Sequence, residues 1–209
     1  MPFDFKKEYK DLYMPKPDPM LIDVPPMNFI MLDGRGDPNG AEYQNAVGTL
    51  YALSYTVKMS KMGGNQPPGY FEYVVPPLEG LWWYDGDSYD LSKRDSWLWI
   101  SMIRQPEFVT AEVFAWAKEA AKKKKPEFDY DKARFAAFHE GLCVQAMHTG
   151  PYDDEPATLA RMHSFLEQHN LKSAVGTERK HHEIYLNDPR KTAPEKIKTV
   201  LRLPVEKLQ

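Results

Sequence analysis

Apolar side chains recur every three to four residues in three stretches of this chain, which is the spacing of one face of a helix. The predicted helices cover 41–62, 111–124 and a stretch that opens at 153–155 and stops near Asn170. Shorter runs rich in β-branched and aromatic residues are typical of strands. The predicted strands cover 29–32, 70–75 with its continuation at 81–84, 96–103, 142–148, 181–186 and 198–203, with a turn at 85–88. The chain therefore mixes helices and strands along most of its length.

Residues with known capping preferences mark the ends of these helices. Thr110 precedes the second helix, where a hydroxyl group can accept a hydrogen bond from a free backbone amide. Gly63 and Gly64 end the first helix, because glycine adopts the left-handed conformation that often terminates one. Pro156 lies in the first turn of the third helix, where its missing amide hydrogen costs no helical hydrogen bond. These signals agree with the apolar periodicity.

The same order of elements, a strand, a glycine-containing turn, a helix and two strands, occurs twice. The first copy covers about 27–103 and the second about 140–205, with one further helix between them. Two such βαββ halves can form one antiparallel sheet with helices on one side, or two sheets that face each other across a cleft. A cleft between similar halves is a natural ligand site. We therefore predict an α+β fold of two pseudo-symmetric halves, as a single domain over 27–209.

The first two dozen residues are rich in proline and charge instead. Five prolines fall at positions 15, 17, 19, 25 and 26. Proline lacks the backbone hydrogen that helices and sheets need. We predict that residues 1–26 form an extended arm laid on the domain, with little regular structure.

Charge and cysteine content exclude some classes of protein, such as nucleic-acid-binding and disulfide-stabilised proteins. The formal net charge is −3, whereas nucleic-acid-binding proteins usually show a clear basic excess. The basic run 122–125 is better explained as a solvated helix end. A single cysteine, Cys143, allows no internal disulfide, which suits a reducing compartment, and no apolar run reaches the length of a membrane span. We expect a cytoplasmic protein that acts without nucleic acid or a membrane.

Four of the five tryptophans lie close together in the first repeat. In a strand, Trp97 and Trp99 point to one face, and one of Trp82 and Trp83 is free to join them because these two point to opposite faces. Aromatic side chains line many ligand pockets, but an ordinary aromatic core explains the same pattern. All four tryptophans are candidate ligand-binding residues.

Alternation along the late strand places His181, Glu183 and Tyr185 on one face, and Ile184 and Leu186 on the other. The apolar pair is expected to face the helices. Glu183 is then expected to face away from them, towards solvent or a cavity. An exposed strand glutamate is the simpler explanation, because glutamate is rarely buried.

Glu72 holds a comparable place in the first repeat and is a weaker ligand-binding candidate. No metal site is expected, because alternation separates the adjacent His181 and His182 and their spacing matches no standard zinc pattern. No phosphate-binding loop, nucleophile elbow or Cys/His dyad is found in the sequence. We expect neither a metal nor a cofactor.

Four segments of the sequence resemble the GyrI-like small-molecule-binding family. These segments are 73–83 (YVVPPLEGLWW), 102–110 (MIRQPEFVT), 147–152 (MHTGPY), and the tail from 183–189 (EIYLNDP) through 203–205. The resemblance covers most of the chain beyond about residue 20, and the tail and the Gly-Pro-Tyr turn are its more specific parts. It implies two pseudo-symmetric βαββ halves that form an antiparallel sheet, with helices on one side and a central ligand cleft.

The resemblance also implies chemistry. In the drug-responsive regulators of this family, a glutamate on a late strand holds cationic aromatic drugs, and Glu183 matches it by position. Some stand-alone members are similar to hydrolases that open the cyclopropane ring of DNA-alkylating natural products. This chain looks like that branch, because no helix-turn-helix domain precedes it. The resemblance thus implies multidrug-type binding and a detoxifying hydrolysis.

The residues suit either activity. A carboxylate against indole rings loses solvation, so its pKa rises and it becomes a better base. Glu183 is expected to activate water, with Tyr185 or Tyr55 donating a hydrogen bond to the oxygen that gains charge. Tryptophans would sandwich a flat substrate, and Tyr152 of the Gly-Pro-Tyr turn is a further expected ligand contact.

Two alternatives to a hydrolase stay open. One is a sequestering or sensing protein that binds drugs without turnover. The other is a module that inhibits a protein partner such as a topoisomerase, for which an exposed patch away from the cleft is expected. In each case we expect a monomer or homodimer.

Overall fold

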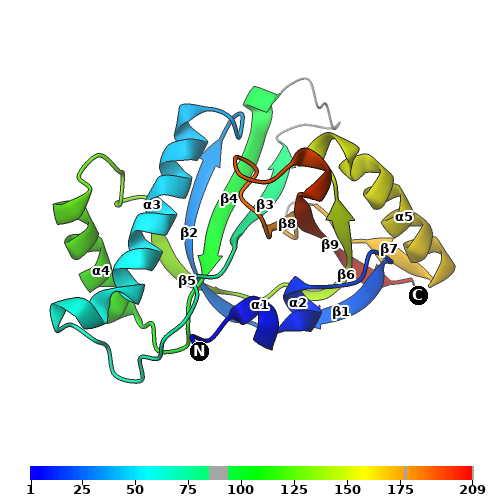
Figure 1. The fold of residues 1–209 in the computed structure, drawn as a ribbon. Coiled ribbons are helices and arrows are strands. Elements are labelled where there is room, and N and C mark those ends of the chain that lie inside the picture. Colours follow the sequence, from blue (N-terminus) through cyan, green and yellow to red (C-terminus); the bar gives the residue numbers. More distant parts are fainter. Residues whose placement is uncertain (85–93, 177, 209) are drawn as a thin grey trace. The chain divides into compact units, whose positions relative to one another are not determined.

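Two groups of elements, each with its own internal contacts, make up the chain (Figure 1). The computed structural model describes residues 1–84, 94–176 and 178–208. Unit 1 comprises Met1–Asp4, Met27–Leu78 and Trp82–Phe138, and unit 2 comprises Phe5–Pro26, Glu79–Leu81 and His139–Gln209. The turn predicted at 85–88 lies outside the described residues. The boundary near residue 139 separates the two predicted repeats.

Unit 1 contains antiparallel strands with two long helices. Its elements are β2 (Met27–Arg35), α3 (Ala41–Lys58), the 3₁₀ turn η1 (Ser60–Gly63), the last residues of β3 (Leu78–Tyr84), η2 (Arg94–Ser96), β4 (Trp97–Arg104), α4 (Ala111–Lys124) and β5 (Arg134–Phe138). Strand β2 pairs antiparallel with β4 on one side and with β5 on the other. Helix α3 packs on β2 and β4, and α4 packs beside α3 (Figure 1).

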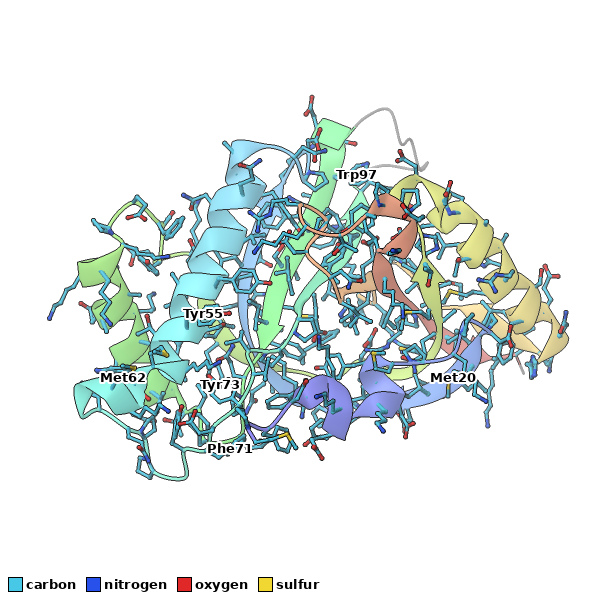
Figure 2. All side chains as sticks on the ribbon, viewed as in Figure 1. Met20, Tyr55, Met62, Phe71, Tyr73 and Trp97 are labelled. Atoms are coloured by element: carbon cyan, nitrogen blue, oxygen red, sulfur yellow. The ribbon has the colours of Figure 1, made fainter. Side chains whose placement is uncertain are left out.

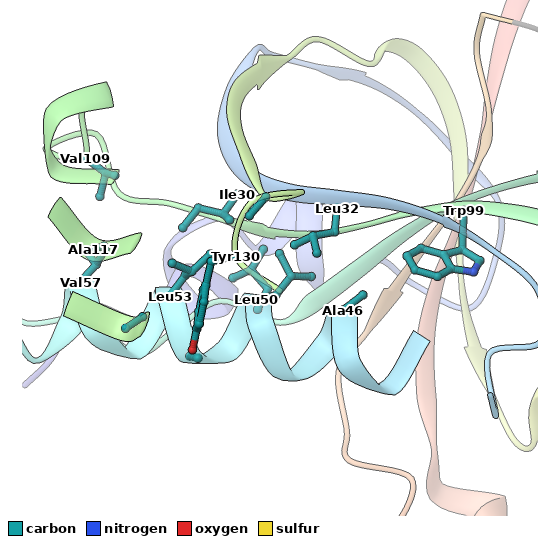
Figure 3. Close-up of a cluster of buried hydrophobic side chains, with 14 residues drawn as sticks. Ile30, Leu32, Ala46, Leu50, Leu53, Val57, Trp99, Val109, Ala117 and Tyr130 are labelled. Carbon is teal, nitrogen blue, oxygen red and sulfur yellow. The ribbon is translucent and has the colours of Figure 1, made fainter. Parts of the chain in front are cut away.

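The core of unit 1 lies between α3 and these strands. Leu50 and Leu53 of α3 are fully buried in one cluster with Ile30 of β2 (Figure 3), and Ile103 of β4 belongs to the same cluster. The apolar spacing of 41–62 brings these side chains to one face of the helix. Thr110 caps α4 as predicted, since its hydroxyl accepts a hydrogen bond from the Val113 amide at 3.3 Å.

Unit 2 contains a second antiparallel group of strands and one long helix. Its elements are α1 (Phe5–Glu8), α2 (Lys10–Tyr13), β1 (Met20–Val24), β6 (Gly141–Thr149), η3 (Tyr152–Asp154), α5 (Glu155–Gln168), β7 (Leu171–Ser173), β8 (His181–Tyr185), η4 (Pro194–Lys196) and β9 (Lys198–Lys207). The strand order is β1-β6-β9-β8, and β7 pairs with another part of β9. Helix α5 packs on β6, with Met162 and Leu166 buried against Val144 and Leu201.

The predicted fold class is confirmed. The chain is α+β, its paired strands within the units are antiparallel, and β2-α3-β3-β4 and β6-α5-β8-β9 repeat the βαββ order. Within each unit the long helices cover one face of the strands.

Two expectations about individual segments were wrong. Residues 70–75 form no strand apart from one bridge between Tyr73 and Phe3, because the flanking prolines at 67–68 and 76–77 remove backbone donors that a ladder needs. The arm is also more regular than predicted, since α1, α2 and β1 lie within residues 1–26. The short strands β5 and β7 were not predicted at all.

Candidate active site

Glu183 lies in the middle of β8, with its side chain only 15% exposed. His182 and Ile184 on either side of it are buried on the opposite face, so the predicted alternation is confirmed. The expected direction of the two faces was wrong. Glu183 is the cross-strand partner of Leu201, whose side chain packs under α5 with Met162, so Glu183 lies on the helix-covered face.

The opposite face of β8 is buried by the N-terminal arm. Tyr13 of α2 donates a hydrogen bond to Glu79 Oε1 at 3.2 Å, and Glu79 Oε2 lies 3.0 Å from His182 Nε2. The expectation assumed that an apolar face must be covered by the helices, whereas Arg202, the cross-strand partner of His182, donates a hydrogen bond to the Leu12 carbonyl oxygen of the arm. With the arm in place, an apolar side chain such as Ile184 can be buried without facing α5.

Two neighbours on the same strand hold the Glu183 carboxylate. Tyr185 Oη donates a hydrogen bond to Glu183 Oε2 at 2.7 Å, and His181 Nε2 lies 3.0 Å from Oε1. Each carboxylate oxygen therefore has one partner, which restricts the rotation of the group. A carboxylate with a fixed orientation and little water around it suits a general base or a receptor for a cation.

Tyr152 stands beside this carboxylate at the end of the Gly-Pro-Tyr turn. Its ring lies 6.0 Å from the ring of Tyr185, nearly perpendicular to it. Burial of the hydroxyl raises the pKa of Tyr152 to about 12, and the charges of Glu183, Glu155 and Asp188 add to that shift. The phenol therefore stays protonated at neutral pH as a hydrogen-bond donor, while the residue as a whole is 38% exposed.

His148 of β6 joins this turn to α5. Its Nε2 lies 3.1 Å from the Pro151 carbonyl oxygen, and its Nδ1 lies 3.0 Å from Thr158 Oγ1. The histidine is 3% exposed. The turn that carries Tyr152 and the helix that begins at Glu155 are thus held to the same strand.

Glu155 is the residue of this cluster that sequence analysis did not single out as functional. It opens α5, is 8% exposed, and its Oε1 has no hydrogen-bond partner among the residues that the structure describes. Burial raises its pKa to about 9, with further contributions from the charges of Glu183 and Asp153. An acidic residue in the first turn of a helix is common because of the helix dipole. Nothing in the sequence therefore distinguished Glu155 from a solvent-exposed helix start.

Three tryptophans of unit 1 lie close together. Trp82 lies 5.8 Å from Trp97, and Tyr43 of α3 lies 5.6 Å from Trp82 and 5.0 Å from Trp99. Trp82 thus joins Trp97 and Trp99, and Trp83 is half-buried. Trp99 is 1% exposed and part of the core under α3 (Figure 3). This burial favours the ordinary-core explanation for Trp99.

Two other candidates lie on the surface of unit 1. Tyr55 of α3, labelled in Figure 2, is 49% exposed, and Lys58 Nζ lies 5.8 Å from the centre of its ring. Glu72 forms an ion pair with Lys61, and its side chain is 47% exposed. The structure therefore brings together Glu183, Tyr185 and Tyr152 of the predicted set. The roles assigned to Tyr55 and Glu72 stay predictions.

Within the described part of the chain, no group of three or more His, Cys, Asp or Glu side chains is placed to hold a metal ion. Among the helices that the structure describes, none is both long and apolar enough to cross a lipid bilayer.

Comparison with known proteins places the chain in a family. The model of the GyrI-like small-molecule-binding domain matches residues 17–206. The chain belongs to the GyrI-like family. The resemblance found in the four sequence segments is thereby confirmed.

Three solved structures from Listeria innocua are close GyrI-like relatives. An uncharacterized conserved protein is 58% identical, with a TM-score of 0.95 over 98% of this chain and 100% of its own. A hydrolase is 56% identical, with a TM-score of 0.90 over 98% of this chain and 100% of its own. A further hydrolase structure is 55% identical, with a TM-score of 0.92 over 99% of this chain and 100% of its own. None of the curated proteins compared with the chain matches it.

Proposed function

We propose that this GyrI-like protein binds lipophilic aromatic small molecules and hydrolyses electrophilic ones, with Glu183 as the general base. The observation that carries the proposal is the held carboxylate of Glu183, with Tyr185 and His181 each engaging one of its oxygens. Relatives at 55% and 56% identity that are described as hydrolases support the reaction class.

The chemistry follows from the surroundings of the carboxylate. Its side chain is only 15% exposed, so few water molecules compete for its lone pairs. In the proposed reaction one water molecule loses a proton to Glu183 as its oxygen attacks an electrophilic carbon atom. The Tyr152 hydroxyl, protonated at neutral pH, is the proposed donor to charge that develops on the substrate. The rings of Tyr152 and Tyr185 offer aromatic surface for a flat ligand.

The proposed substrates are strained or otherwise electrophilic aromatic compounds, with cyclopropane-bearing alkylators as the first class to test. Water addition to such a compound destroys its alkylating carbon, so the proposed physiological role is detoxification. This substrate class comes from the resemblance to ring-opening members of the family. The held carboxylate is consistent with it but would serve other electrophiles as well.

Replacing Glu183 with glutamine tests the base. The amide keeps the size of the side chain and removes its ability to accept a proton, so we expect turnover to fall at least about 100-fold, the usual contribution of a general base. The measurement incubates the protein with a panel of flat aromatic electrophiles and quantifies water-added products by mass spectrometry.

The matched control is Glu167→Gln, because Glu167 is an exposed glutamate near the C-terminal end of α5. It is expected to leave turnover unchanged. A Glu183→Gln protein that still converts the substrate at the wild-type rate contradicts the assignment of the base.

A binding protein without turnover is the second candidate, and the same held carboxylate favours it. An ionised glutamate beside aromatic rings attracts lipophilic cations. Titration of a lipophilic cation, followed by tryptophan fluorescence and calorimetry, separates the two candidates. Saturation at one ligand per chain with no product from any electrophile would favour a sequestering protein over a hydrolase.

A further inference from the structure

The carboxyl group of Glu155 is buried without the partner that a buried polar group normally has. The residue is 8% exposed, and its Oε1 is fully enclosed yet makes no hydrogen bond to any residue that the structure describes. More than nine in ten buried polar groups in proteins are hydrogen-bonded. Leaving a buried carboxyl oxygen without a partner destabilises the fold, so this group calls for a role beyond starting α5.

Glu155 shares its side of the strands with Glu183. Helix α5 begins at Glu155 and covers the face on which Glu183 lies, and the two carboxyl groups interact electrostatically. Tyr152 lies within the electrostatic range of both. The two carboxyl groups therefore belong to one cluster, although their residues are 28 positions apart.

The charged groups that act directly on the Glu155 carboxyl group are both acidic, Glu183 of β8 and Asp153 of η3. Tyr152 of η3 interacts with Glu155 and also with Asp188 in the loop after β8. His181 and Tyr185 of β8 bind Glu183, and His148 of β6 contacts Thr158 of α5. Asp188 is held by Arg190, whose side chain and backbone amide lower its pKa to about 2. The surroundings of Glu155 are thus mainly acidic, which opposes a second negative charge.

Burial and these neighbours keep Glu155 protonated, since its pKa is raised to about 9. Glu183 has a hydrogen-bond partner on each oxygen, whereas Glu155 Oε1 has none in the described chain. Two carboxyl groups whose environments differ in this way commonly divide the roles of acid and base between them.

We propose that Glu155 is the general acid of the site and works beside Glu183, the proposed general base. This inference rests on the proposed hydrolysis and extends it, because it names the group that delivers a proton to the leaving atom.

The reaction balances without any further reagent. The oxygen of water forms a bond to the electrophilic carbon, and one proton of that water passes to Glu183. The bond from that carbon to the leaving atom breaks, its electron pair stays on the leaving atom, and the proton of Glu155 is transferred there. A proton then returns from Glu183 to Glu155, which restores the pair. The net change is the addition of one water molecule.

The state of the pair can be measured without any substrate. In wild-type protein with ¹³C-labelled glutamate side chains, NMR across pH 4 to 10 follows each carboxyl group. We expect one glutamate to titrate near 9, and its signal to disappear in Glu155→Asp, which removes one labelled glutamate but keeps a carboxylic acid. A spectrum in which no glutamate titrates above neutral pH overturns the proposal, even if a substituted protein fails to fold.

The role of Glu155 in turnover is measured with Glu155→Gln, against Glu167→Gln as the control on the same helix. We expect kcat to fall about 100-fold or more with little change in KM, as for loss of a general acid. We also expect the fall of kcat/KM at alkaline pH to disappear, because the group that loses its proton there is gone. A variant that keeps the wild-type kcat overturns the acid role.

The experiments distinguish an incorrect acid role of Glu155 from an incorrect proposal of hydrolysis. If turnover is lost in Glu183→Gln but kept in Glu155→Gln, only the role of Glu155 as the general acid is contradicted. If wild-type protein gives no water-added product with any compound, the hydrolysis and the acid role are both contradicted. The NMR titration then reports only whether Glu155 is protonated at neutral pH.

Discussion

His182 has a carboxyl oxygen on each of its ring nitrogens, inside unit 2. Nε2 lies 3.0 Å from Glu79 and Nδ1 lies 3.0 Å from Glu140, which also accepts a hydrogen bond from Arg202 at 2.8 Å. Burial alone would lower the pKa of His182, but Glu140 and Glu79 outweigh it and raise the pKa to about 9. Burial would likewise raise the pKa of Glu140, but His182 and Arg202 lower it to about 2. Glu140, His182 and Arg202 thus stabilise each other's charged forms.

This cluster predicts how stability depends on pH. Because the folded pKa of His182, about 9, exceeds its unfolded value of 6.5, its contribution is complete below pH 6.5 and is lost as the pH rises through 9. The shift corresponds to about 3 kcal/mol. Glu140 acts in the opposite sense, with a contribution present above pH 4.5 and lost as the pH falls towards 2. Denaturant unfolding at a series of pH values measures the loss of stability on the alkaline side and on the acid side.

Glu155 adds to the loss of stability at rising pH, because its raised pKa makes the free energy of unfolding fall between pH 4.5 and 9. The variants His182→Gln and Glu155→Gln separate the contributions of these two residues. In each variant we expect the free energy of unfolding to depend less steeply on pH. An unfolding free energy that stays constant from pH 6.5 to 9 in the wild type contradicts the charged state of His182.

One cross-strand pair of β2 and β4 places a glycine opposite a tryptophan. Gly34 pairs with Trp99, whose indole ring lies over it so closely that a Cβ atom on Gly34 would come within 2.1 Å of Trp99 Cη2. The indole fills the space that a side chain at position 34 would occupy, which is a known way to protect glycine within a sheet. The pairing also explains how Trp99 becomes fully buried.

Replacing Gly34 with alanine is expected to displace the Trp99 ring and destabilise the protein by about 1–3 kcal/mol, the usual cost of overpacking a core. Thermal unfolding and the emission spectrum of tryptophan measure the two effects. The control is Gly176→Ala, because a Cβ atom there meets nothing within 4 Å. Wild-type stability in Gly34→Ala would show that the ring moves aside at no cost.

The positions of most elements could be predicted because they depend on local patterns. Helix α4 begins and ends where its apolar spacing and the Thr110 cap indicated. Segment 70–75 has the composition of a strand but lies between two pairs of prolines, and only Tyr73 finds a partner. Strand propensity reflects packing against neighbours, so it fails where the neighbouring strand is missing.

On the scale of the whole molecule, the N-terminal arm completes unit 2. Arg202 of β9 donates a hydrogen bond to the Leu12 carbonyl oxygen at 2.9 Å, and Gln145 of β6 donates one to the Asp11 carbonyl oxygen at 2.5 Å. Tyr13 reaches Glu79, which in turn contacts His182. The first residues of the chain therefore satisfy buried polar groups near its last strand.

Deletion of residues 1–18 is expected to destabilise the protein, because it removes acceptors and donors from buried charged groups. Each hydrogen bond to a charged group contributes about 1.5–3 kcal/mol, and the loss includes those at Arg202 and Glu79. Chemical denaturation of the shortened chain measures the total, and Tyr13→Phe isolates one bond. A shortened chain as stable as the full chain would show that the arm contributes little.

The sequence by itself determined the α+β class, the two βαββ repeats, the order of faces along β8 and the family, because these follow from periodicity and from motifs that lie close together in the chain. The sequence also indicated Glu183 as a candidate site residue, from the alternation along its strand and from the family resemblance. Only the tertiary structure decided that Glu183 lies under α5, that Glu155 is buried in the same cluster, and that the arm covers the other face of β8. The physical reason is that burial and charge at these residues are set by partners tens to nearly two hundred positions away, which no local pattern encodes.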